Sequence, residues 1–515
     1  MTTSKTGVVT VMMVCAASLA GAQPLTLAEA TARALQRNTD IRIEREAVKA
    51  ADARELRAQG SYDFELKADV SERHHLDPIV TLFSGAPQGE VTPSNTDFSS
   101  SVSLNKLFTS GATTTVSASV ARNMTDSFFT LFVPAYLTSI GVQARQPLLR
   151  NRETDQARTQ LRVTALNKAK SRADLQQQVL NVVASVEQAY WTLVAARREE
   201  EVRRDSITLA EQQRTDTQAR IDARTAAPLD IAQPTAEVER RRGDYFAARE
   251  SVVRAEHVLK LLIADDPADP IWNQTLEPSE PADTAPTKVD VQRALTDALA
   301  HRPELVSLGA DVSAAEAQTA LARDALKVQV DLVGGYNMRG MAGTHNPETV
   351  TFPGVISPFP EILSGALGTS YSALFNQRFV DASIGVSVDV PIGRRAAHGD
   401  LGAAEASRGQ ASLQLLKMRQ RIAADVLDAA TALDTAVSRI QAARAGLDAA
   451  NTQLMAEQLR FTAGTSTSFL VLTRQNDLQQ AQLTEISAAT QYRRALTEFA
   501  RATGMLLSDR NITVK

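Results

Sequence analysis

Few residues in this chain have the types and spacing that catalysis or metal binding requires. His74 and His75 are adjacent, and neighbouring residues of a strand point to opposite faces, so a single metal site would rarely take both. Cys15 is the only cysteine among the 515 residues. The sequence contains no glycine-rich strand-to-helix turn, no zinc-ligand spacing and no nucleophile elbow. It therefore predicts no enzyme, no catalytic residue, no metal site and no cofactor.

Clustered arginines are the other candidates for chemistry. They stand among acidic residues in stretches that favour helix, so we interpret them as solvated helix faces with i, i+4 ion pairs. The formal net charge of −4 gives no strongly basic surface, so nucleic acid is an improbable partner. The clusters are Arg197-Arg198, Arg203-Arg204 and Arg240-Arg241-Arg242.

The first 22 residues have the composition of an export signal. Lys5 precedes an apolar run over residues 7–20, and Ala20-Gly21-Ala22 predicts cleavage after Ala22. Cys15 lies inside this signal, so the mature chain would hold no cysteine. The residues before Cys15 lack the small side chain expected next to a lipidated cysteine. No later segment reaches the roughly 18 apolar residues of a transmembrane helix, so we expect no spanning helix.

The remaining chain repeats itself. Residues 34–41 return as 298–305, a shift of 264 (298 − 34), and 139–142 return as 383–386, a shift of 244 (383 − 139). A repeat of this length indicates one structural unit copied. We therefore predict a first copy over 23–264, a Pro- and Asp-rich linker over 265–287, a second copy over 288–506 and a tail over 507–515.

Each copy contains a strand region, about 62–146 and about 326–390. Residues 64–71 alternate apolar and polar side chains, and four segments with this pattern, each about 10 residues long, have the length of a tilted membrane strand. A soluble sandwich would show the same alternation. Export, the small number of strands and the aromatics around them favour an outer-membrane barrel.

Four strands cannot close a barrel, because about eight are needed, and an open edge cannot face lipid. Several chains must share one barrel: a trimer would give 12 strands and a dimer 8. We favour the trimer because it leaves a water-filled interior. Residues 99–107 and 112–123 predict an additional hairpin in the first copy, which either joins the barrel or stands outside it.

Very long helices follow each strand region, over about 153–224 and 399–462. At about 1.5 Å per residue each would extend roughly 100 Å, and sevenfold apolar spacing predicts coiled-coil packing. Each long helix ends in a turn and reverses into a second helix, over 229–263 and 468–504. The residues at the two hairpin tips are Thr225, Pro228, Gly464 and Thr465.

With this order of elements, the chain resembles the TolC-like outer membrane efflux proteins. The resemblance rests on the signal, the duplicated helix-strand-strand-helix plan, Gln146-Pro147-Leu148-Leu149 closing a strand, and the stretch 460–472 around the second tip. It implies an α+β membrane protein in the outer membrane, with a β-barrel shared by a homotrimer and a helical tunnel in the periplasm. It also implies that the tips dock on a periplasmic adaptor and an inner-membrane transporter.

The resemblance also locates a tunnel entrance. Where the family has an acidic ring, this chain has Leu470 and Thr473, with Arg474 beside them. Asp230 matches a family aspartate that links the two hairpins, but its arginine partner is replaced by Ser466 and a neighbouring tyrosine by Phe461. We expect Asp230 either to pair with Arg220 or Arg224 or to act as a carboxylate at a helix N-terminus.

Two functions remain after this reasoning. The first is a passive exit duct of a tripartite efflux or type I secretion system. The alternative is a periplasmic coiled-coil adaptor, which would share the hairpins but would not need strands of membrane length. Drugs, metals and secreted polypeptides all remain possible substrates, because the partner pump would choose the cargo.

Overall fold

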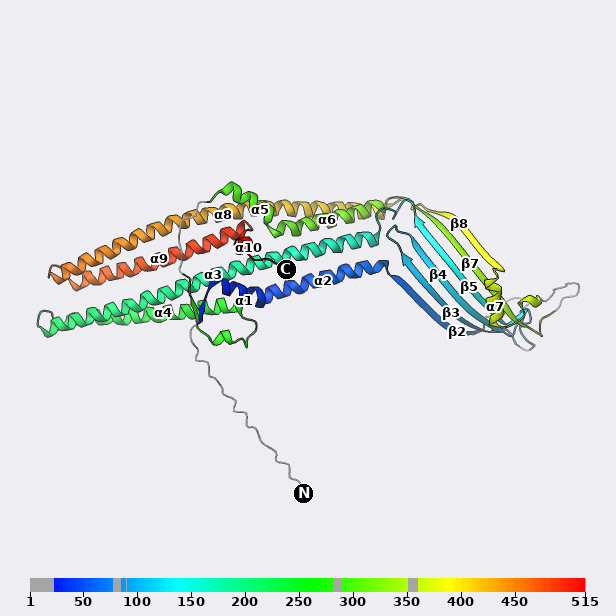
Figure 1. Ribbon diagram of the computed structural model, residues 1–515, viewed down its shortest axis with the longest axis horizontal. Coiled ribbons are helices and arrows are strands. Elements are labelled where there is room, and N and C mark those ends of the chain that lie inside the picture. Colours follow the sequence, from blue (N-terminus) through cyan, green and yellow to red (C-terminus); the bar gives the residue numbers. More distant parts are fainter. Residues whose placement is uncertain (1–22, 77–84, 89, 281–288, 351–359, 515) are drawn as a thin grey trace, which may run out of the picture. The chain divides into compact units, whose positions relative to one another are not determined.

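The computed structural model describes residues 23–76, 85–88, 90–280, 289–350 and 360–514 (Figure 1). They form two compact units. Within the described residues, a helical unit comprises 23–49, 170–308 and 414–514, and a sheet unit comprises 50–169 and 309–413. Each copy of the repeat contributes to both units. The predicted signal peptide, 1–22, lies outside the described residues.

The sheet unit is built on one six-stranded sheet, in the order β2-β3-β4-β5-β7-β8, with every neighbouring pair antiparallel (Figure 1). The additional hairpin is part of this sheet, as β3 and β4, so the expected count of four strands is wrong. The strands hold 11 to 17 residues rather than about 10. They are β2 (Phe64–Leu76), β3 (Ser94–Leu107), β4 (Thr113–Thr125), β5 (Phe132–Pro147), β7 (Gln329–His345) and β8 (Phe379–Asp389).

The register gives the sheet one apolar and one polar face, because directly opposed residues of antiparallel strands point to the same side. One row across the six strands forms part of the apolar face: Leu66, Leu104, Val116, Val142, Tyr336 and Ala382. The adjacent row forms part of the polar face: Lys67, Ser103, Ser117, Gly141, Asn337 and Asp381. Large side chains of the apolar face remain exposed in the single chain.

Helices leave the sheet in pairs, one pair from each copy. In the first pair, Lys168 of α3 (Gln156–Asp222) lies 2.8 Å from Asp52 and 3.0 Å from Glu55 of α2 (Thr39–Gln59). In the second, Thr319 of α6 (Pro303–Asp324) donates to the Ala404 carbonyl of α8 (Arg395–Thr462) at 3.2 Å. These contacts fix the direction in which the chain leaves the strands.

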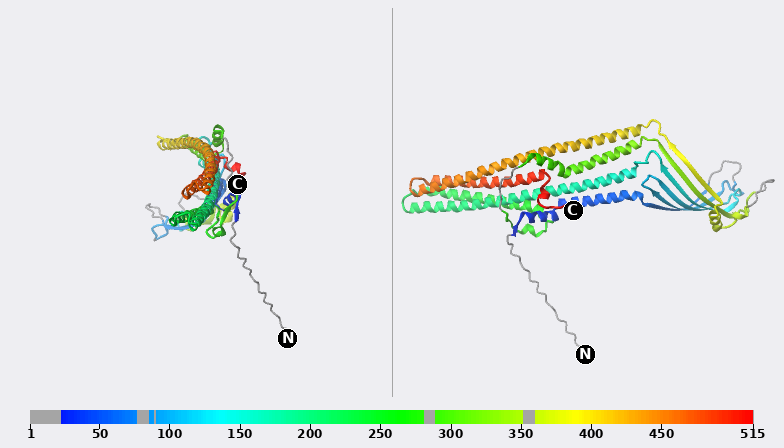
Figure 2. Two further views of the ribbon diagram at one scale, coloured as in Figure 1. Left: turned by 90° about the vertical axis from the view of Figure 1, so that its left-hand side faces the viewer. Right: turned by 45° about the horizontal axis from the view of Figure 1, so that its top comes forward.

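The helical unit packs four long helices in one curved layer (Figure 2). α4 (Ala232–Ile263) reverses from α3, and α9 (Ser468–Ala502) reverses from α8. Alanine is frequent where α8 meets α9, and its small side chain lets the backbones approach closely. The α8–α9 contacts include Leu433, Ala436, Ile440, Ala443, Ala488, Ala489 and Tyr492.

One described helix, α3, is long and apolar enough by length and composition to cross a membrane, which the sequence analysis did not expect. Buried residues make up 67% of the apolar window. The helix contributes to the main core, where Val183 and Val186 are fully buried. The apolar character of α3 is that of a core helix.

The segment predicted as a linker is partly built into the helical unit. β6 (Leu276–Pro278) pairs in parallel with β1 (Gln23–Leu25), which precedes α1 (Leu27–Arg37). Asp269 accepts a hydrogen bond from the Ile271 amide at 3.0 Å, and this bond is the main cause that lowers the pKa of its carboxyl group. The segment 265–280 therefore ties the start of the first copy to its end.

The interpretation of all the arginine clusters as solvated is wrong for one residue. The Arg241 side chain is 1% exposed. It donates to Glu237 Oε1 at 2.8 Å, to the Ser206 carbonyl at 2.8 Å and to Asn476 Oδ1 at 3.1 Å. These three acceptors, from α4, α3 and α9, compensate for the hydration that the buried guanidinium loses. Helical spacing within one segment does not predict hydrogen bonds to other helices.

Candidate functional site: the two hairpin tips

Tip 1, residues 223–231, joins α3 to α4 through a left-handed residue. Arg224 has φ = 58°. The amide and the hydroxyl of Thr225 both donate to the Arg220 carbonyl, at 2.9 and 3.0 Å. Pro228 then opens a short 3-10 helix, Pro228–Ile231, where its missing amide hydrogen is not needed. The turn closes the carbonyl end of α3 and starts α4.

Tip 2, residues 463–467, repeats this turn between α8 and α9. Gly464 has φ = 75°. The amide and the hydroxyl of Thr465 donate to the Arg460 carbonyl, at 3.0 and 3.1 Å. Thr467 caps α9 by accepting from the Leu470 amide. The two tips match at a shift of 240 residues (465 − 225), so the duplication extends to individual hydrogen bonds.

Asp230 acts inside its own tip. Its Oδ2 accepts from the Ala227 amide at 3.0 Å, the geometry of a helix-capping carboxylate. Among the described residues, the recorded partner of the Asp230 carboxylate is this amide, and no ion pair joins it to Arg220 or Arg224. The Arg220 guanidinium instead lies 3.9 Å from the centroid of the Phe461 ring. A cation–π contact therefore links the end of α3 to the end of α8, just before the two tips, and the sequence gives no signal for this contact.

The entrance candidates of tip 2 lie on the first turns of α9. Leu470 is 40% exposed. The Thr473 hydroxyl donates to the Phe469 carbonyl at 2.9 Å. Arg474 lies 2.9 Å from Asp477, and this carboxylate balances its charge. The first turn of α9 contains no acidic residue. Within one chain this surface is therefore not acidic.

A buried polar network connects α3, α4 and α9 next to the tips. Burial acts to raise the pKa of Glu237, but hydrogen bonds from Arg240 and Arg241 outweigh it and hold the pKa below its ordinary value. Arg241 reaches Asn476 of α9, and Gln213 of α3 donates to Ser468 at the start of α9 at 2.8 Å. The network joins three of the four long helices near their ends.

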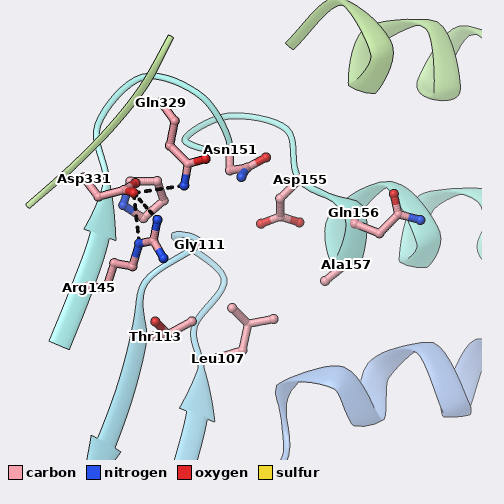
Figure 3. Close-up of a pocket in the computed structure, with 11 residues that line it drawn as sticks. Leu107, Gly111, Thr113, Arg145, Asn151, Asp155, Gln156, Ala157, Gln329 and Asp331 are labelled. Atoms are coloured by element: carbon pink, nitrogen blue, oxygen red, sulfur yellow. Dashed lines mark hydrogen bonds and ion pairs between the residues drawn. The ribbon is translucent and has the colours of Figure 1, made fainter. Parts of the chain in front are cut away.

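A pocket at the strand-to-helix junction of the sheet unit is a second candidate (Figure 3). Asp331 is almost fully buried there, and it accepts from Arg145 and, at 3.0 Å, from Gln329. On the helix side, the Arg158 guanidinium donates to the Asn151 carbonyl at 2.7 Å. The polar groups that line the pocket hydrogen-bond to one another. We therefore interpret the pocket as part of the structural junction between the strands and α3.

The remaining candidates do not converge. His74 Nδ1 lies 3.0 Å from Thr96 Oγ1, and His75 Nδ1 lies 3.7 Å from Asp97 Oδ2. His74 lies on the apolar face and His75 on the polar face, as the strand periodicity predicts. Across the described residues, no three His, Cys, Asp or Glu side chains form a group that could hold a metal ion.

Comparison with sequence families gives one match. The family model described as outer membrane efflux protein matches residues 294–505. This range covers most of the second copy. Comparison with the curated proteins finds no match.

Solved structures of outer-membrane channels share the fold. The chain is 15% identical to the outer-membrane channel OprN, covering 93% of this chain and 89% of that chain, with a TM-score of 0.65. It is 14% identical to the outer membrane channel CmeC of Campylobacter jejuni, covering 93% of this chain and 86% of that chain, with a TM-score of 0.65. It is 15% identical to the outer membrane protein VceC of Vibrio cholerae, covering 93% of this chain and 96% of that chain, with a TM-score of 0.64. The α+β fold of long helices and antiparallel strands is thereby confirmed.

Proposed function

We propose that the chain is a member of the outer membrane efflux protein family, whose model matches residues 294–505, and that three copies of it assemble into one exit duct of a tripartite efflux or type I secretion system. The observation that carries the proposal is the six-stranded sheet with one apolar and one polar face. A sheet of this kind can stand in lipid only if its edges are paired and its polar face surrounds water.

The sheet cannot close by itself. Its terminal strands, β2 and β8, each have one neighbouring strand in the order of the sheet. Six strands are fewer than the roughly eight that a closed barrel needs. Pairing β8 of one copy with β2 of the next closes the ring, and three copies give 18 strands (3 × 6) in place of the 12 that four strands per chain would give. The polar faces then line the lumen and the apolar faces meet lipid.

The long helices would form the tunnel of the proposed duct. α3 holds 67 residues and α8 holds 68, so each extends about 100 Å at 1.5 Å per residue. A length of this order exceeds any membrane core and suits a tunnel through the periplasm. Its walls would be the helix hairpins, packed against those of neighbouring copies.

The tips, at Thr225, Pro228, Gly464 and Thr465, would dock on a periplasmic adaptor that connects the duct to an inner-membrane transporter. Leu470, Thr473 and Arg474 would line the entrance, with Asp230 on the neighbouring tip. No acidic ring forms at these positions, so the entrance would not concentrate cations as an acidic ring does. The transporter supplies energy and chooses among drugs, metals and polypeptides, while the duct gives the solute a hydrated path.

Membrane extraction and mass measurement test the assembly. We expect the mature chain to leave outer membranes only with detergent, and native mass spectrometry to give the mass of three chains rather than two. A monomer soluble without detergent would overturn the proposal and favour the periplasmic adaptor. Identification of the inner-membrane protein crosslinked to the tips would then assign the pump class: a peptidase-coupled exporter for polypeptides, a proton-driven pump for small molecules or metals.

A further inference from the structure

A short helix covers part of the apolar face of the sheet. α7 (Leu367–Phe375) packs on β5 and β7, with Ser370 and Leu374 fully buried beneath it (Figure 1). The Thr138 hydroxyl lies 3.0 Å from the Ser370 hydroxyl. A Cβ on Gly340 would come within 1.9 Å of the Ser370 carbonyl oxygen, so only glycine allows this approach. The helix is therefore a fixed part of the sheet unit.

The register assigns α7 to the apolar face. Thr138 and Gly340 are directly paired across β5 and β7. Two residues along each strand, on the same face, Ile140 pairs with Met338. This face is the one that would meet lipid, so α7 lies outside the barrel and not in its lumen.

α7 packs on the sheet where the aliphatic part of the apolar face ends, at the row of Thr138. In the next row beyond Thr138, charged and aromatic side chains replace the aliphatic ones. Within this row the Arg122 guanidinium lies 3.4 Å from Glu72 and 5.9 Å from the centroid of the Phe98 ring. Rows of this composition mark the level of lipid head groups in membrane barrels. The members of the row are Glu72, Phe98, Arg122, Tyr136 and Ala342.

The outward side of α7 presents aromatic and basic groups. The Tyr371 and Phe375 rings stack with centroids 6.5 Å apart, and Phe375 is 67% exposed. Arg378, three residues further, is exposed in the position just before β8. Stacked aromatics beside a cation, continuous with an apolar sheet face, match the boundary between acyl chains and anionic head groups.

We propose that α7 is an external interfacial helix, which rests on the outer leaflet with the Tyr371–Phe375 pair at the level where head groups meet acyl chains and with Arg378 among phosphate-bearing head groups. This inference rests on the proposed function, since it requires the apolar face to contact lipid. It assigns a lipid-binding surface to residues 367–378, which precede β8. The helix would fix the height of the barrel in the membrane.

Spin labelling of single cysteines tests the position of α7. Because Cys15 is the only cysteine and lies in the predicted signal, the mature chain allows one label at a time. The labelled variants are Phe375→Cys on α7, Ile384→Cys on the apolar face, where the side chain is 83% exposed, and Ser117→Cys on the polar face. The probe is a vesicle of phosphatidylethanolamine and phosphatidylglycerol, and the measurement is the accessibility of each label to oxygen and to a water-soluble nickel chelate.

The three labels separate the possible outcomes. We expect position 384 to favour oxygen, position 117 to favour nickel, and position 375 to favour oxygen at a shallower depth than 384. If position 375 matches 117 while 384 stays in lipid, α7 is solvated and this inference fails while the channel stands. If position 384 is itself accessible to nickel and not to oxygen, the sheet is not in the membrane and the proposed function fails as well.

Discussion

Tip 1 places Arg224 in the left-handed region of φ, where tip 2 places Gly464. Both tips make the same pair of hydrogen bonds from a threonine to an arginine carbonyl. The supporting residues differ: tip 1 has a capping aspartate, Asp230, and the buried Arg241, whereas the equivalent positions of the second copy hold Leu470 and Ala481. The two copies therefore share the turn but not the residues that stabilise it.

Removal of the buried arginine should give the largest difference between the two hairpins. Arg241→Ala leaves Ser206 and Asn476 acceptors without their donor, so we expect the free energy of unfolding to fall by about 3 kcal/mol. Thermal unfolding in detergent, followed by circular dichroism, measures the change. Arg242→Ala, whose side chain is exposed on the same helix, is the matched control and should shift the midpoint much less. Equal shifts for both variants would contradict the role of Arg241.

The Arg241 effect should also depend on pH. The folded-state pKa of Glu237 is lowered by Arg240 and Arg241, so its stabilising contribution is fully present above the unfolded value and is lost as the pH falls through the folded pKa. We therefore expect the midpoint difference between Arg241→Ala and the parent chain to shrink below about pH 4, near the ordinary glutamate range. A difference that stays constant down to acid unfolding would exclude the Glu237 carboxylate as the cause.

Substitution of the left-handed residues should change the stability of the two tips in opposite directions. Gly464→Ala should destabilise the chain by about 1 kcal/mol, because a Cβ there meets no atom within 4 Å and the cost is conformational alone. Arg224→Gly should stabilise tip 1 by up to about 1 kcal/mol, reduced by the added freedom of the unfolded chain. Hydrogen exchange of the tip amides reads each change locally. Stability changes of opposite sign for the two variants support a shared left-handed turn. Stability changes of the same sign in both tips would refute it.

Substitutions of Asp230 distinguish a helix-capping role from a gating role. Asp230→Ala should cost about 1 kcal/mol through loss of the bond to the Ala227 amide, and Asp230→Asn should retain most of that stability. Single-channel conductance and antibiotic sensitivity of the same variants test the gate. If both stay unchanged in Asp230→Ala, the gating role is abandoned and the cap remains.

The contact between the tips should have the smallest effect. Phe461→Leu keeps the apolar volume but removes the aromatic face under Arg220, so we expect a loss of about 0.5 kcal/mol. A double-mutant cycle with Arg220→Gln isolates this coupling from the separate effects of the two side chains. A coupling of zero would mean that the rings and the cation are neighbours without attraction.

The sequence predicts the repetitive parts of this fold better than the parts that depend on distant packing. The long helices were expected because sevenfold spacing persists over many turns, and the alternation in residues 64–71 identified a strand with two unlike faces. The sequence does not predict the burial of Arg241, because Ser206 and Asn476 approach it from other helices. It does not predict α7 for the same reason, since the position of this helix depends on Gly340 of a distant strand. Serine-rich alternation in β3 indicated a strand but not its neighbours.

The hairpin β3–β4 changes the bore of the proposed duct. Because barrel diameter increases roughly in proportion to strand number, 18 strands in place of 12 enlarge the luminal cross-section about twofold. Resistances along one aqueous column add, so its narrowest ring limits the current. Widening at the mouth therefore leaves the current almost unchanged, and the narrowest ring also sets the largest particle that can pass. The inserted strands would widen the mouth in the membrane without changing which solutes enter the duct.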